Sequence, residues 1–404
     1  MEVTLVGVGL GNPSTLTAGA AAALKQADGL IGSRRLLEEC PLPQSVPRKF
    51  STKSAEIVEI LKKQSWQNPC VLYSGDTGFY SGARTLVPLL EAEHIPFQVL
   101  PGISSLQYFA ARLGRSWQEW SVVSAHGLNC DPVGEILAAH GKPVFFLTSG
   151  ADGAGSLCER LTQAGLGHLT ATVGQSLSYP QEQILSDSVS RLAGHVFAPL
   201  TVLLVEGYTS CRPAGSQGLP DEVFLRGNVP MTKQEIRAAA IGKLAVRDGE
   251  TYWDVGAGTG SVSVELALLA PHSTVCAVEC GGEACSLIRA NREKFGVYNL
   301  ELTHGRAPEV LAQLPAPDAV FIGGGGELPA ILEAALRKNP AARFCITAIA
   351  VETLGTAAAA MTQLGMEPQI SQVTVARSRA AGELHLMMGQ NPVWIITGRK
   401  EALV

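Results

Sequence analysis

The sequence has few aromatic and few charged residues, and it contains no long uninterrupted apolar run. Aromatic side chains make up 6% of the 404 residues, and Asp, Glu, Lys and Arg together make up 17%. No apolar stretch reaches the roughly 18 residues needed to span a bilayer. Residues 1–6 run directly into a strand pattern without the basic region of a signal peptide. We therefore expect a cytoplasmic protein that does not contact membranes.

A run of basic residues is also missing. The formal net charge is −5, and Lys and Arg are scattered along the chain. A protein that neutralises many phosphates normally presents a basic face. The composition therefore disfavours nucleic acid as the main partner. A small polyanionic substrate stays open, because a few arginines in a pocket suffice to bind it.

The nine cysteines lack the spacing of a metal site. The closest cluster, Cys276, Cys280 and Cys285, has gaps of three and four residues. Zinc and thioredoxin-type motifs have gaps of two residues, and the spacing expected for the iron–sulfur cluster of a radical enzyme is missing too. The sequence predicts no metal centre. It favours buried free thiols in a reducing compartment.

The length predicts two domains, because 404 residues exceed what one hydrophobic core usually supports. Apolar residues make up 46% of the chain, which is enough for two cores. Residues 208–220 are dominated by Pro, Gly, Ser and polar side chains and have the composition of a linker. We predict domains at 1–207 and 221–404.

Both halves alternate short apolar runs with helical patterns, which predicts mostly parallel α/β sheets. In the first half the expected strands are 3–8, 29–32, 71–73, 122–125, 143–147 and 200–205, and residue 143 opens a second lobe. In the second half they are 252–255, 275–279, 300–303, 319–322, 344–347, 370–376 and 393–397, the last two as a hairpin-like edge. Seven strands in this order are typical of a doubly wound methyltransferase fold.

A glycine loop in the second half predicts a methyl-donor site. It follows a strand and opens a helix, and Glu279 closes the next strand. Alternate glycines let the backbone approach a flat ligand, and a terminal carboxylate can accept both ribose hydroxyls. The candidate binding residues in the loop are Asp254, Gly256, Ala257, Gly258, Thr259 and Gly260.

Two other interpretations of this loop stay open. A nicotinamide dinucleotide site needs its third glycine one residue later, and Asp254 would repel the phosphates. The same carboxylate attracts the charged amino group of S-adenosylmethionine, which favours the methyl donor. A glycine turn that binds no ligand is the remaining alternative.

Further motifs in the second half give it a family resemblance. Together with the glycine loop, segments 229–233, 305–309, 315–324 and 376–380 resemble the C15-methylating, C12-decarboxylating domain of the precorrin pathway, over about residues 221–404. The run Gly323 to Gly326 departs from the family, which often has a serine there. The resemblance implies that Thr232, Arg306 and Ala307 also belong to the donor site. It implies a substrate-binding role for Arg377 and Arg379, because arginine pairs bidentately with carboxylates. Solvated charges on an edge strand are the alternative for these two arginines.

The first half carries a second resemblance. The loop at 7–13 is a weak signal alone, since Asn12 stands where a dinucleotide site has its third glycine. With segments 75–80, 101–105 and 204–206 it resembles the tetrapyrrole methylase superfamily, nearest to the branch that methylates C5 of precorrins. The residues that the resemblance implies for donor binding are Gly9, Gly11, Asp76, Ser104 and Ser105. Helix or turn capping is the alternative for Asp76 and the two serines.

The sequence contains no convincing Ser/His/Asp or Cys/His set. Tyr80 and His126 are the candidate catalytic residues of the first half. Tyr80 could instead pack in the core, and His126 could be a satisfied loop histidine. A catalytic base must also reach a substrate proton, which sequence does not show.

The two resemblances together imply a two-lobed tetrapyrrole methylase (class III) fold followed by a seven-stranded Rossmann-like class I methyltransferase fold. They imply S-adenosylmethionine-dependent methylation of precorrin-6Y (precorrin-6B) at C5 and C15. Decarboxylation of the C12 acetate would accompany it and give precorrin-8X in cobalamin biosynthesis. They also imply a homo-oligomer. The alternatives are methylation of another tetrapyrrole, methylation of RNA, and a sensor that binds the donor without catalysis.

Overall fold

The computed structural model describes residues 1–40, 45–126, 130–148, 153–209, 217–324 and 326–400. The chain divides into two compact units. The first unit comprises Met1–Cys130, Lys142–Thr162 and Gly167–Glu206, and the second comprises Asp131–Gly141, Gln163–Leu166 and Gly207–Val404. Residues 210–216 of the predicted linker lie outside the described residues, and the limits 1–207 and 221–404 stay a prediction.

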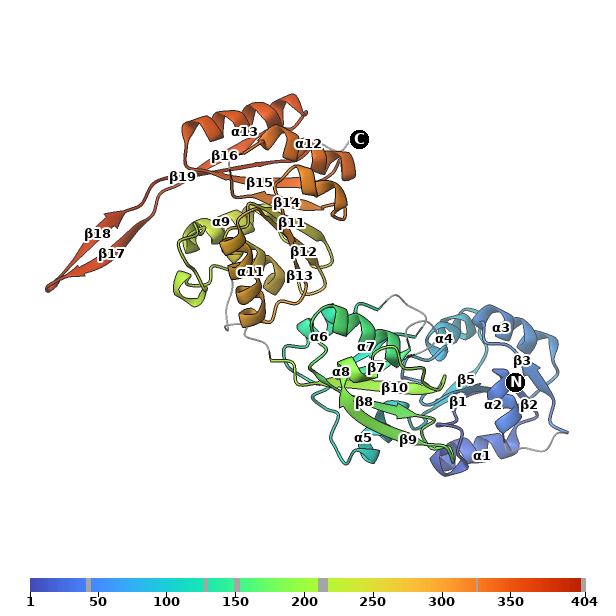
Figure 1. Cartoon of the computed structure of the whole chain (residues 1–404). Helices are drawn as coiled ribbons and strands as arrows, with labels where there is room; N and C mark the ends of the chain where they lie inside the picture. Colours follow the sequence, from blue (N-terminus) through green and yellow to red (C-terminus); the bar gives the residue numbers. More distant parts are fainter. Residues whose placement is uncertain (41–44, 127–129, 149–152, 210–216, 325, 401–404) are drawn as a thin grey trace. The chain divides into compact units, whose positions relative to one another are not determined.

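The first lobe of the first unit is a parallel sheet (Figure 1). Its strand order is β3-β2-β4-β1-β5, and every neighbouring pair is parallel. The strands are β1 (Val3–Gly7), β2 (Gly29–Gly32), β3 (Arg48–Phe50), β4 (Pro69–Tyr73) and β5 (Phe97–Leu100). The helical elements are η1 (Pro13–Thr15), α1 (Ala18–Gln26), α2 (Arg34–Glu39), α3 (Ser54–Lys63) and α4 (Ala83–Ala92). Every residue of β1 and β2 is buried, as expected for a parallel sheet covered on both faces.

The second lobe of the first unit is a mixed sheet of order β6-β7-β10-β8-β9. Only β6 and β7 pair in parallel, so the expectation of a mostly parallel sheet is wrong for this lobe. The strands are β6 (Ser121–Ser124), β7 (Val144–Leu147), β8 (Thr170–Gln175), β9 (Gln183–Ser188) and β10 (Thr201–Glu206). The helices between these strands are α5 (Ser105–Arg112), α7 (Ala154–Gln163) and α8 (Val189–Leu192), together with α6 (Pro132–Ala138), which belongs to the second unit. Sequence analysis missed β9 because its residues are mostly exposed and lack apolar alternation.

The second unit contains the predicted seven-stranded sheet, in the order β13-β12-β11-β14-β15-β19-β16. The strands are β11 (Thr251–Val255), β12 (Thr274–Glu279), β13 (Leu300–His304), β14 (Ala319–Ile322), β15 (Arg343–Ala348), β16 (Gln369–Val373) and β19 (Val393–Gly398). Strand β19 runs antiparallel to β15 and β16, and the other pairs are parallel. The helical elements are η2 (Asp221–Val223), α9 (Gln234–Leu244), α10 (Ser261–Leu269), α11 (Gly282–Phe295), η3 (Glu309–Gln313), α12 (Leu328–Lys338) and α13 (Val351–Gln363).

A second hairpin interrupts the predicted edge pair of this sheet. Strand β16 ends at Val373, so the expectation of one strand over 370–376 is wrong at its C-terminal end. Strands β17 (Ala376–Ala381) and β18 (Leu384–Gly389) follow and pair only with each other. They project from the sheet of their unit as a long two-stranded arm (Figure 1). Sequence analysis missed this hairpin because its residues are almost all exposed and β17 has little apolar surface.

None of the helices in the described part of the chain is both long enough and apolar enough to cross a membrane.

Candidate active sites

A cavity of about 240 Å³ lies in the first unit, lined by residues of both lobes. Four residues singled out in the sequence line it: Asp76, Tyr80, Ser105 and His126. Asp76 and Tyr80 follow β4, Ser105 begins α5 and His126 follows β6. The carboxyl ends of parallel strands are where α/β sheets bind ligands. The cavity is therefore the candidate active site of the first unit.

Asp76 holds two backbone segments of the cavity wall. Its Oδ2 accepts a hydrogen bond from the N–H of Gly78 at 3.0 Å, and its Oδ1 accepts one from the N–H of Gly102 at 3.0 Å. Asp76 therefore stabilises a turn, as the alternative interpretation of its sequence motif proposed. A carboxylate offers about four acceptor sites, so both oxygens can also accept from a ligand.

Tyr80 and His126 are exposed at the cavity. Tyr80 adopts a left-handed backbone with φ of 47° and is 57% exposed, and its ring meets Phe79 edge-on at 5.1 Å. The Tyr80 hydroxyl donates to the carbonyl of Val122 at 3.1 Å. A left-handed φ is uncommon outside glycine and tends to occur where function requires it. Tyr80 is not core packing, and both side chains can reach a molecule in the cavity.

Three predicted donor-binding residues of the first unit lie close to this cavity without lining it. A Cβ at Gly9 would lie 2.5 Å from Thr15 Oγ1, and one at Gly11 would lie 2.1 Å from the Tyr179 hydroxyl. The backbone of Thr15 leaves no room for a side chain at Gly9, and at Gly11 the positive φ of 96° favours glycine. Ser104 is buried and forms a capping box at the start of α5, as its alternative interpretation proposed.

Sequence analysis missed Arg35, which also lines the cavity. Its Nη1 donates to Glu39 at 2.9 Å and to the Tyr179 hydroxyl at 2.7 Å, and its Nη2 donates to Ser74 at 3.1 Å. Arg35 thereby links the two lobes across the cavity. The signal that could have found it is the Gly32-Ser33 turn, which directly follows a buried strand.

A second cleft, of about 160 Å³, lies at the carboxyl ends of β11, β12 and β14 in the second unit. It brings together four predicted residues: Gly256, Glu279, Arg306 and Ala307. The cleft is also lined by apolar side chains, among them Val255, Ile322 and Ile331, and by Cys280. An apolar wall beside a carboxylate is the chemistry that an adenosine group needs.

Backbone amides orient the Glu279 carboxylate. Its Oε1 accepts from the N–H groups of Cys280 and Gly281, and its Oε2 accepts from the N–H of Gly258, each at 2.8 Å. Three of its roughly four acceptor sites are thus filled, and Oε2 keeps one for a ligand. Because the amides fix the carboxylate beforehand, binding costs little further ordering.

Asp254 does not reach the cleft. Its carboxyl is completely buried and accepts a hydrogen bond from Ser263. Burial raises the pKa of Asp254 to about 7, against the lowering effect of the Ser263 hydroxyl. Its Oδ1 has no hydrogen-bond partner among the described residues. The geometry places this side chain behind the glycine loop.

The other predicted residues of the loop act through the backbone. Gly256, Gly258 and Gly260 all have positive φ, and a Cβ at Gly258 would lie 2.8 Å from the carbonyl oxygen of Pro230. Ala257 and Thr259 complete the turn but do not line the cleft, and neither does Thr232. Segment 229–232, which contains Thr232, packs directly on the loop through Pro230.

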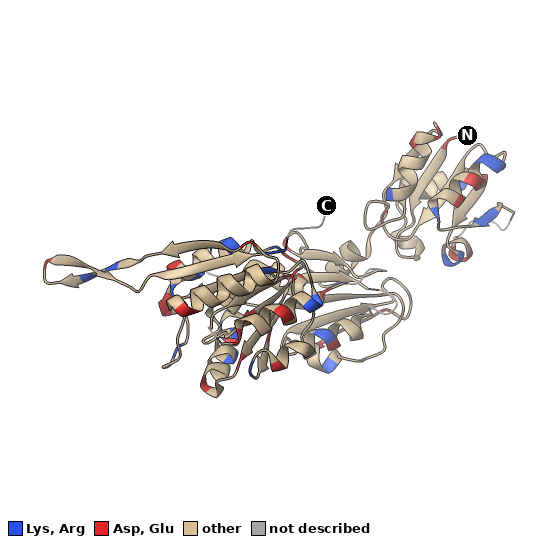
Figure 2. Ribbon diagram, turned by 90° about the horizontal axis from the view of Figure 1, so that it is seen from above, with Lys and Arg blue, Asp and Glu red and all other residues tan. Residues whose placement is uncertain are grey.

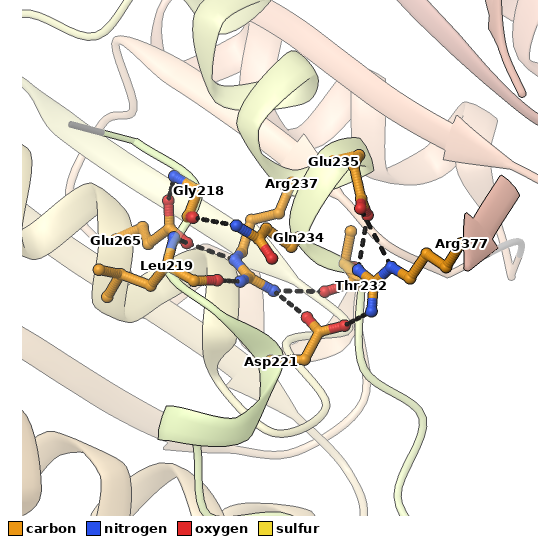
Figure 3. A network of polar contacts seen from close by, with 9 residues as sticks. All are labelled: Gly218, Leu219, Asp221, Thr232, Gln234, Glu235, Arg237, Glu265 and Arg377. Carbon is orange, nitrogen blue, oxygen red and sulfur yellow. Dashed lines mark hydrogen bonds and ion pairs between the residues drawn. The ribbon is translucent and has the colours of Figure 1, made fainter. Parts of the chain in front are cut away.

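The two predicted substrate-binding arginines lie on β17, away from the cleft lining. Arg377 pairs with two carboxylates of its own unit, Asp221 and Glu235 (Figure 3). Arg379 is exposed on the hairpin. The structure therefore does not bring either arginine together with Glu279.

Two family models match the chain. A model described as tetrapyrrole (corrin/porphyrin) methylases matches residues 2–193, and one described as a precorrin methyltransferase domain matches residues 222–400. The Sinorhizobium protein named precorrin-6Y C(5,15)-methyltransferase [decarboxylating] is 32% identical over 341 residues, which cover 83% of this chain and 81% of that protein.

Shorter relatives match about half of the chain. A Pyrobaculum calidifontis protein named probable cobalt-precorrin-6B C(15)-methyltransferase (decarboxylating) is 46% identical over 189 residues, 46% of this chain and 97% of that protein. The solved structure of a Geobacter metallireducens precorrin-6Y C5,15-methyltransferase is 36% identical and covers 46% of this chain and 97% of that one, with a TM-score of 0.44.

The fold and the matches define a methyltransferase built from two different α/β domains, a tetrapyrrole methylase and a precorrin methyltransferase domain. The similarity to the Sinorhizobium protein extends through both domains in a single alignment. The chain belongs to the family of the decarboxylating precorrin-6Y C(5,15)-methyltransferases.

Proposed function

We propose that the chain methylates precorrin-6Y (precorrin-6B) at C5 and C15 and decarboxylates the C12 acetate, giving precorrin-8X in cobalamin biosynthesis. The observation that carries this proposal is the match to a relative of that name over 83% of the chain. The first unit would methylate C5. The second would methylate C15 and release carbon dioxide, which the precorrin methyltransferase match over 222–400 supports.

S-adenosylmethionine is the proposed methyl donor for both units. When bound, it would supply the methyl group that is transferred to the substrate. In the second unit the residues fit it on three counts. Glu279 has one acceptor site free for a ribose hydroxyl. Val255 and Ala307 offer apolar surface for adenine. The positive-φ glycines let the backbone come close to the ligand.

In the first unit, the fit rests on the cavity that lies between the two lobes. Ser105 and the oxygens of Asp76 offer hydrogen bonds to the donor, and Phe79 and Leu177 offer apolar contact. Tyr80 and His126 are the proposed groups that hold or move a proton of the substrate. The described residues of this cavity lining include no cysteine.

The chain's main contribution to catalysis is alignment. The proposed acceptor carbons are enamine-like and nucleophilic, so a covalent enzyme nucleophile is not required. Holding two reactants in line can supply much of the lowering of the barrier. The sulfonium charge disappears during transfer, and the apolar walls of both clefts favour that loss.

We also propose that the protein acts as a homo-oligomer in the cytoplasm. The β17–β18 hairpin supports the first part, because a two-stranded hairpin alone is marginally stable in water. Leu384, Leu386 and Met388 share one face of β18 and are exposed. A second copy could cover them. The described cysteines are all free and mostly buried, which fits a reducing compartment.

Methylation of RNA is the less favoured alternative. Figure 2 shows acidic and basic residues interspersed along the helices, with few of either on the central strands. The charges of the described residues therefore offer no basic track for a phosphate backbone. A tetrapyrrole with acetate and propionate arms needs only a few local cations such as Arg35 and Arg379.

Mass spectrometry of a precorrin-6Y-type substrate, incubated with S-adenosylmethionine and the intact chain, tests the proposal. We expect the gain of two methyl groups and the loss of one carbon dioxide. Ser105→Phe, which fills the first cavity, should leave one methyl transfer and the decarboxylation. An unchanged substrate mass, with the donor bound, would contradict the proposal and direct the search to other acceptors.

A further inference from the structure

A buried arginine ties the start of the second unit to the segment that carries Thr232 (Figure 3). Arg237 of α9 has no exposed surface. Its Nη1 donates to the carbonyl of Thr232 at 2.5 Å, and its Nη2 donates to the carbonyl of Leu219. A buried guanidinium that donates to two chain segments fixes them relative to each other, because leaving its donors unpaired is costly.

The anion that balances Arg237 is also buried. Glu265 of α10 accepts from the Nε of Arg237, and it accepts from the N–H groups of Gly218 at 2.7 Å and Leu219 at 2.9 Å. Buried ion pairs are retained at acceptable cost only when further hydrogen bonds satisfy both partners. This pair meets that condition through the backbone of residues 218 and 219, so it anchors that segment rigidly.

Arg377 joins the same network from the base of the β17–β18 hairpin. It pairs with Asp221 at 3.2 Å and donates to both oxygens of Glu235, at 3.0 and 2.6 Å. Asp221 is 3% exposed and lies between the two arginines, with its other oxygen 3.4 Å from Nη1 of Arg237. The same Nη1 therefore serves both Asp221 and the carbonyl of Thr232.

The segment that Arg237 holds lies against the glycine loop. Beyond the contact of Pro230 with Gly258, the buried Asn291 donates to the carbonyls of Leu225 and Thr259, each at 2.9 Å. Both contacts join the chain before α9 to the loop that opens α10. A shift of this segment is therefore transmitted to the loop whose amide binds Glu279.

We propose that Arg237 and Arg377 are positioning residues for the methyl-donor site of the second unit. Arg237 holds the Thr232 carbonyl, and Arg377 shares Asp221 so that this carboxylate does not draw Arg237 away from Thr232. The inference rests on the proposed function, because the donor is the ligand that the glycine loop would hold. It replaces the expected contact of Arg377 with a substrate carboxylate.

Alkylation of Cys280 provides a readout specific to this cleft in the full chain. Cys280 lines the cleft and is the exposed cysteine among the described ones. Iodoacetamide labelling, followed by peptide mass spectrometry at Cys280, reports how much S-adenosylhomocysteine is needed to protect the thiol. For Arg377→Met, we expect that half-protection of Cys280 needs a concentration of S-adenosylhomocysteine at least about fivefold higher than in the wild type. This factor is at the lower end of the coupling between two sites. Arg377→Lys, which keeps the charge, should recover part of the loss.

Arg343 supplies the matched control. It makes an equally two-pronged pair with Glu250 in the same unit, at 2.9 and 2.5 Å, outside the cleft lining. Arg343→Met should lower the melting temperature and keep the wild-type protection of Cys280. Equal shifts in protection for the two variants would mean that both act through general stability, and that result would overturn the proposal. Wild-type protection in Arg377→Met would overturn it as well.

Hydrogen exchange separates failure of this inference from failure of the proposed function. If S-adenosylhomocysteine gives wild-type Cys280 no protection, the second cleft is not a donor site. In that case, the exchange rates of the backbone amides in residues 229–236 test the inference. Faster exchange there in Arg377→Met, with unchanged exchange in Arg343→Met, would support positioning of the segment, and unchanged exchange in both would refute it. Arg237→Met is unsuitable because it leaves the buried Glu265 carboxylate without its cation.

Discussion

The two units of this chain build their candidate active sites in different ways. Each has a tight glycine turn after its first strand and a carboxylate at the end of another strand. In the second unit, the cleft lies at the carboxyl ends of the strands of one sheet, and three backbone amides orient Glu279. In the first unit, the walls come from two lobes, and Asp76 braces the backbone. The comparison shows that a carboxylate near a glycine turn can be oriented by backbone amides with an acceptor site left over, as Glu279 is, or can brace two backbone segments, as Asp76 does.

The largest expected effect follows from removing Glu279, the proposed donor-binding carboxylate. Glu279→Ala should weaken donor binding in the second unit about 100-fold. The substitution removes the hydrogen bond of the carboxylate to the ligand, and it leaves three backbone N–H groups without their acceptor. Protection of Cys280 by S-adenosylhomocysteine measures this loss. C5 methylation should persist. Glu301→Gln, on the exposed face of neighbouring β13, is the control and should bind as the wild type does.

The glycine loop should tolerate a side chain poorly at Gly258 and well at Gly282. Gly258 has φ of 57° and its added Cβ would lie 2.8 Å from Pro230 O. We expect Gly258→Ala to weaken donor binding about tenfold, since a left-handed alanine costs about 1–2 kcal/mol. Gly282 begins α11 with open space around it, so Gly282→Ala should be neutral or stabilising. Calorimetric titration and thermal melting distinguish the two outcomes, and equal behaviour of both variants would refute the close packing.

In the first unit the sharpest change is at Arg35, which links the lobes through Tyr179 and Glu39. Arg35→Met should raise the KM for the tetrapyrrole about fivefold, because the substrate loses a hydrogen bond from the charged guanidinium. Its effect on C15 methylation should be small. Lys62→Met, at an exposed ion pair with Glu93 on the same lobe, is the control. A KM that stays at the wild-type value would exclude Arg35 from substrate binding.

An effect on the pH dependence of stability, and not on donor binding, is expected from the buried Asp254, whose raised pKa of about 7 exceeds its ordinary value of 3.8. Between these two values, the folded protein keeps a proton that the unfolded chain has lost. Its contribution to stability therefore declines as pH rises from about 4 to about 7, by at most about 1.4 kcal/mol per pH unit. Urea unfolding at several pH values should show a steeper decline for the wild type than for Asp254→Asn. Parallel curves would contradict the raised pKa.

The sequence predicted the second unit more completely than the first for a physical reason. The Asp254–Ser261 loop and Glu279 belong to consecutive β-α-β elements, so chain order alone brings Gly256 and Glu279 to the same sheet edge. Burial of both faces of the parallel strands gave apolar runs of strand length. The predicted seven-stranded sheet was confirmed with small shifts at the ends of its strands.

The residues that sequence analysis missed depend on tertiary packing. Arg35 and Tyr179 are 144 residues apart and meet only because the two lobes close around the cavity. The roles expected for Arg377 and for the Asp254 side chain came from resemblance or charge. The structure pairs Arg377 with Asp221 and buries Asp254 behind the loop. The local pattern of a strand or turn does not encode which partner a long side chain finds.

The hairpin also shows the limit of local pattern. Its β18 strand has apolar residues on both faces, and β17 has small and polar ones, so neither alternates as a half-buried strand does. If a second copy covers Leu386 and Met388, light scattering should show an oligomer that Leu386→Glu shifts to smaller species. A monomeric wild type would contradict the proposed assembly.

The division of labour between the two units is tested most directly by product analysis with the Glu279→Ala chain. A precorrin-6Y-type substrate and S-adenosylmethionine are incubated with wild type and variant, and the products are resolved by mass and by the position of the new methyl. We expect two methyl transfers and decarboxylation from the wild type, and from Glu279→Ala one methyl at C5 with the carboxyl retained. Decarboxylation by the variant at the wild-type rate would show that the second cleft does not perform that chemistry.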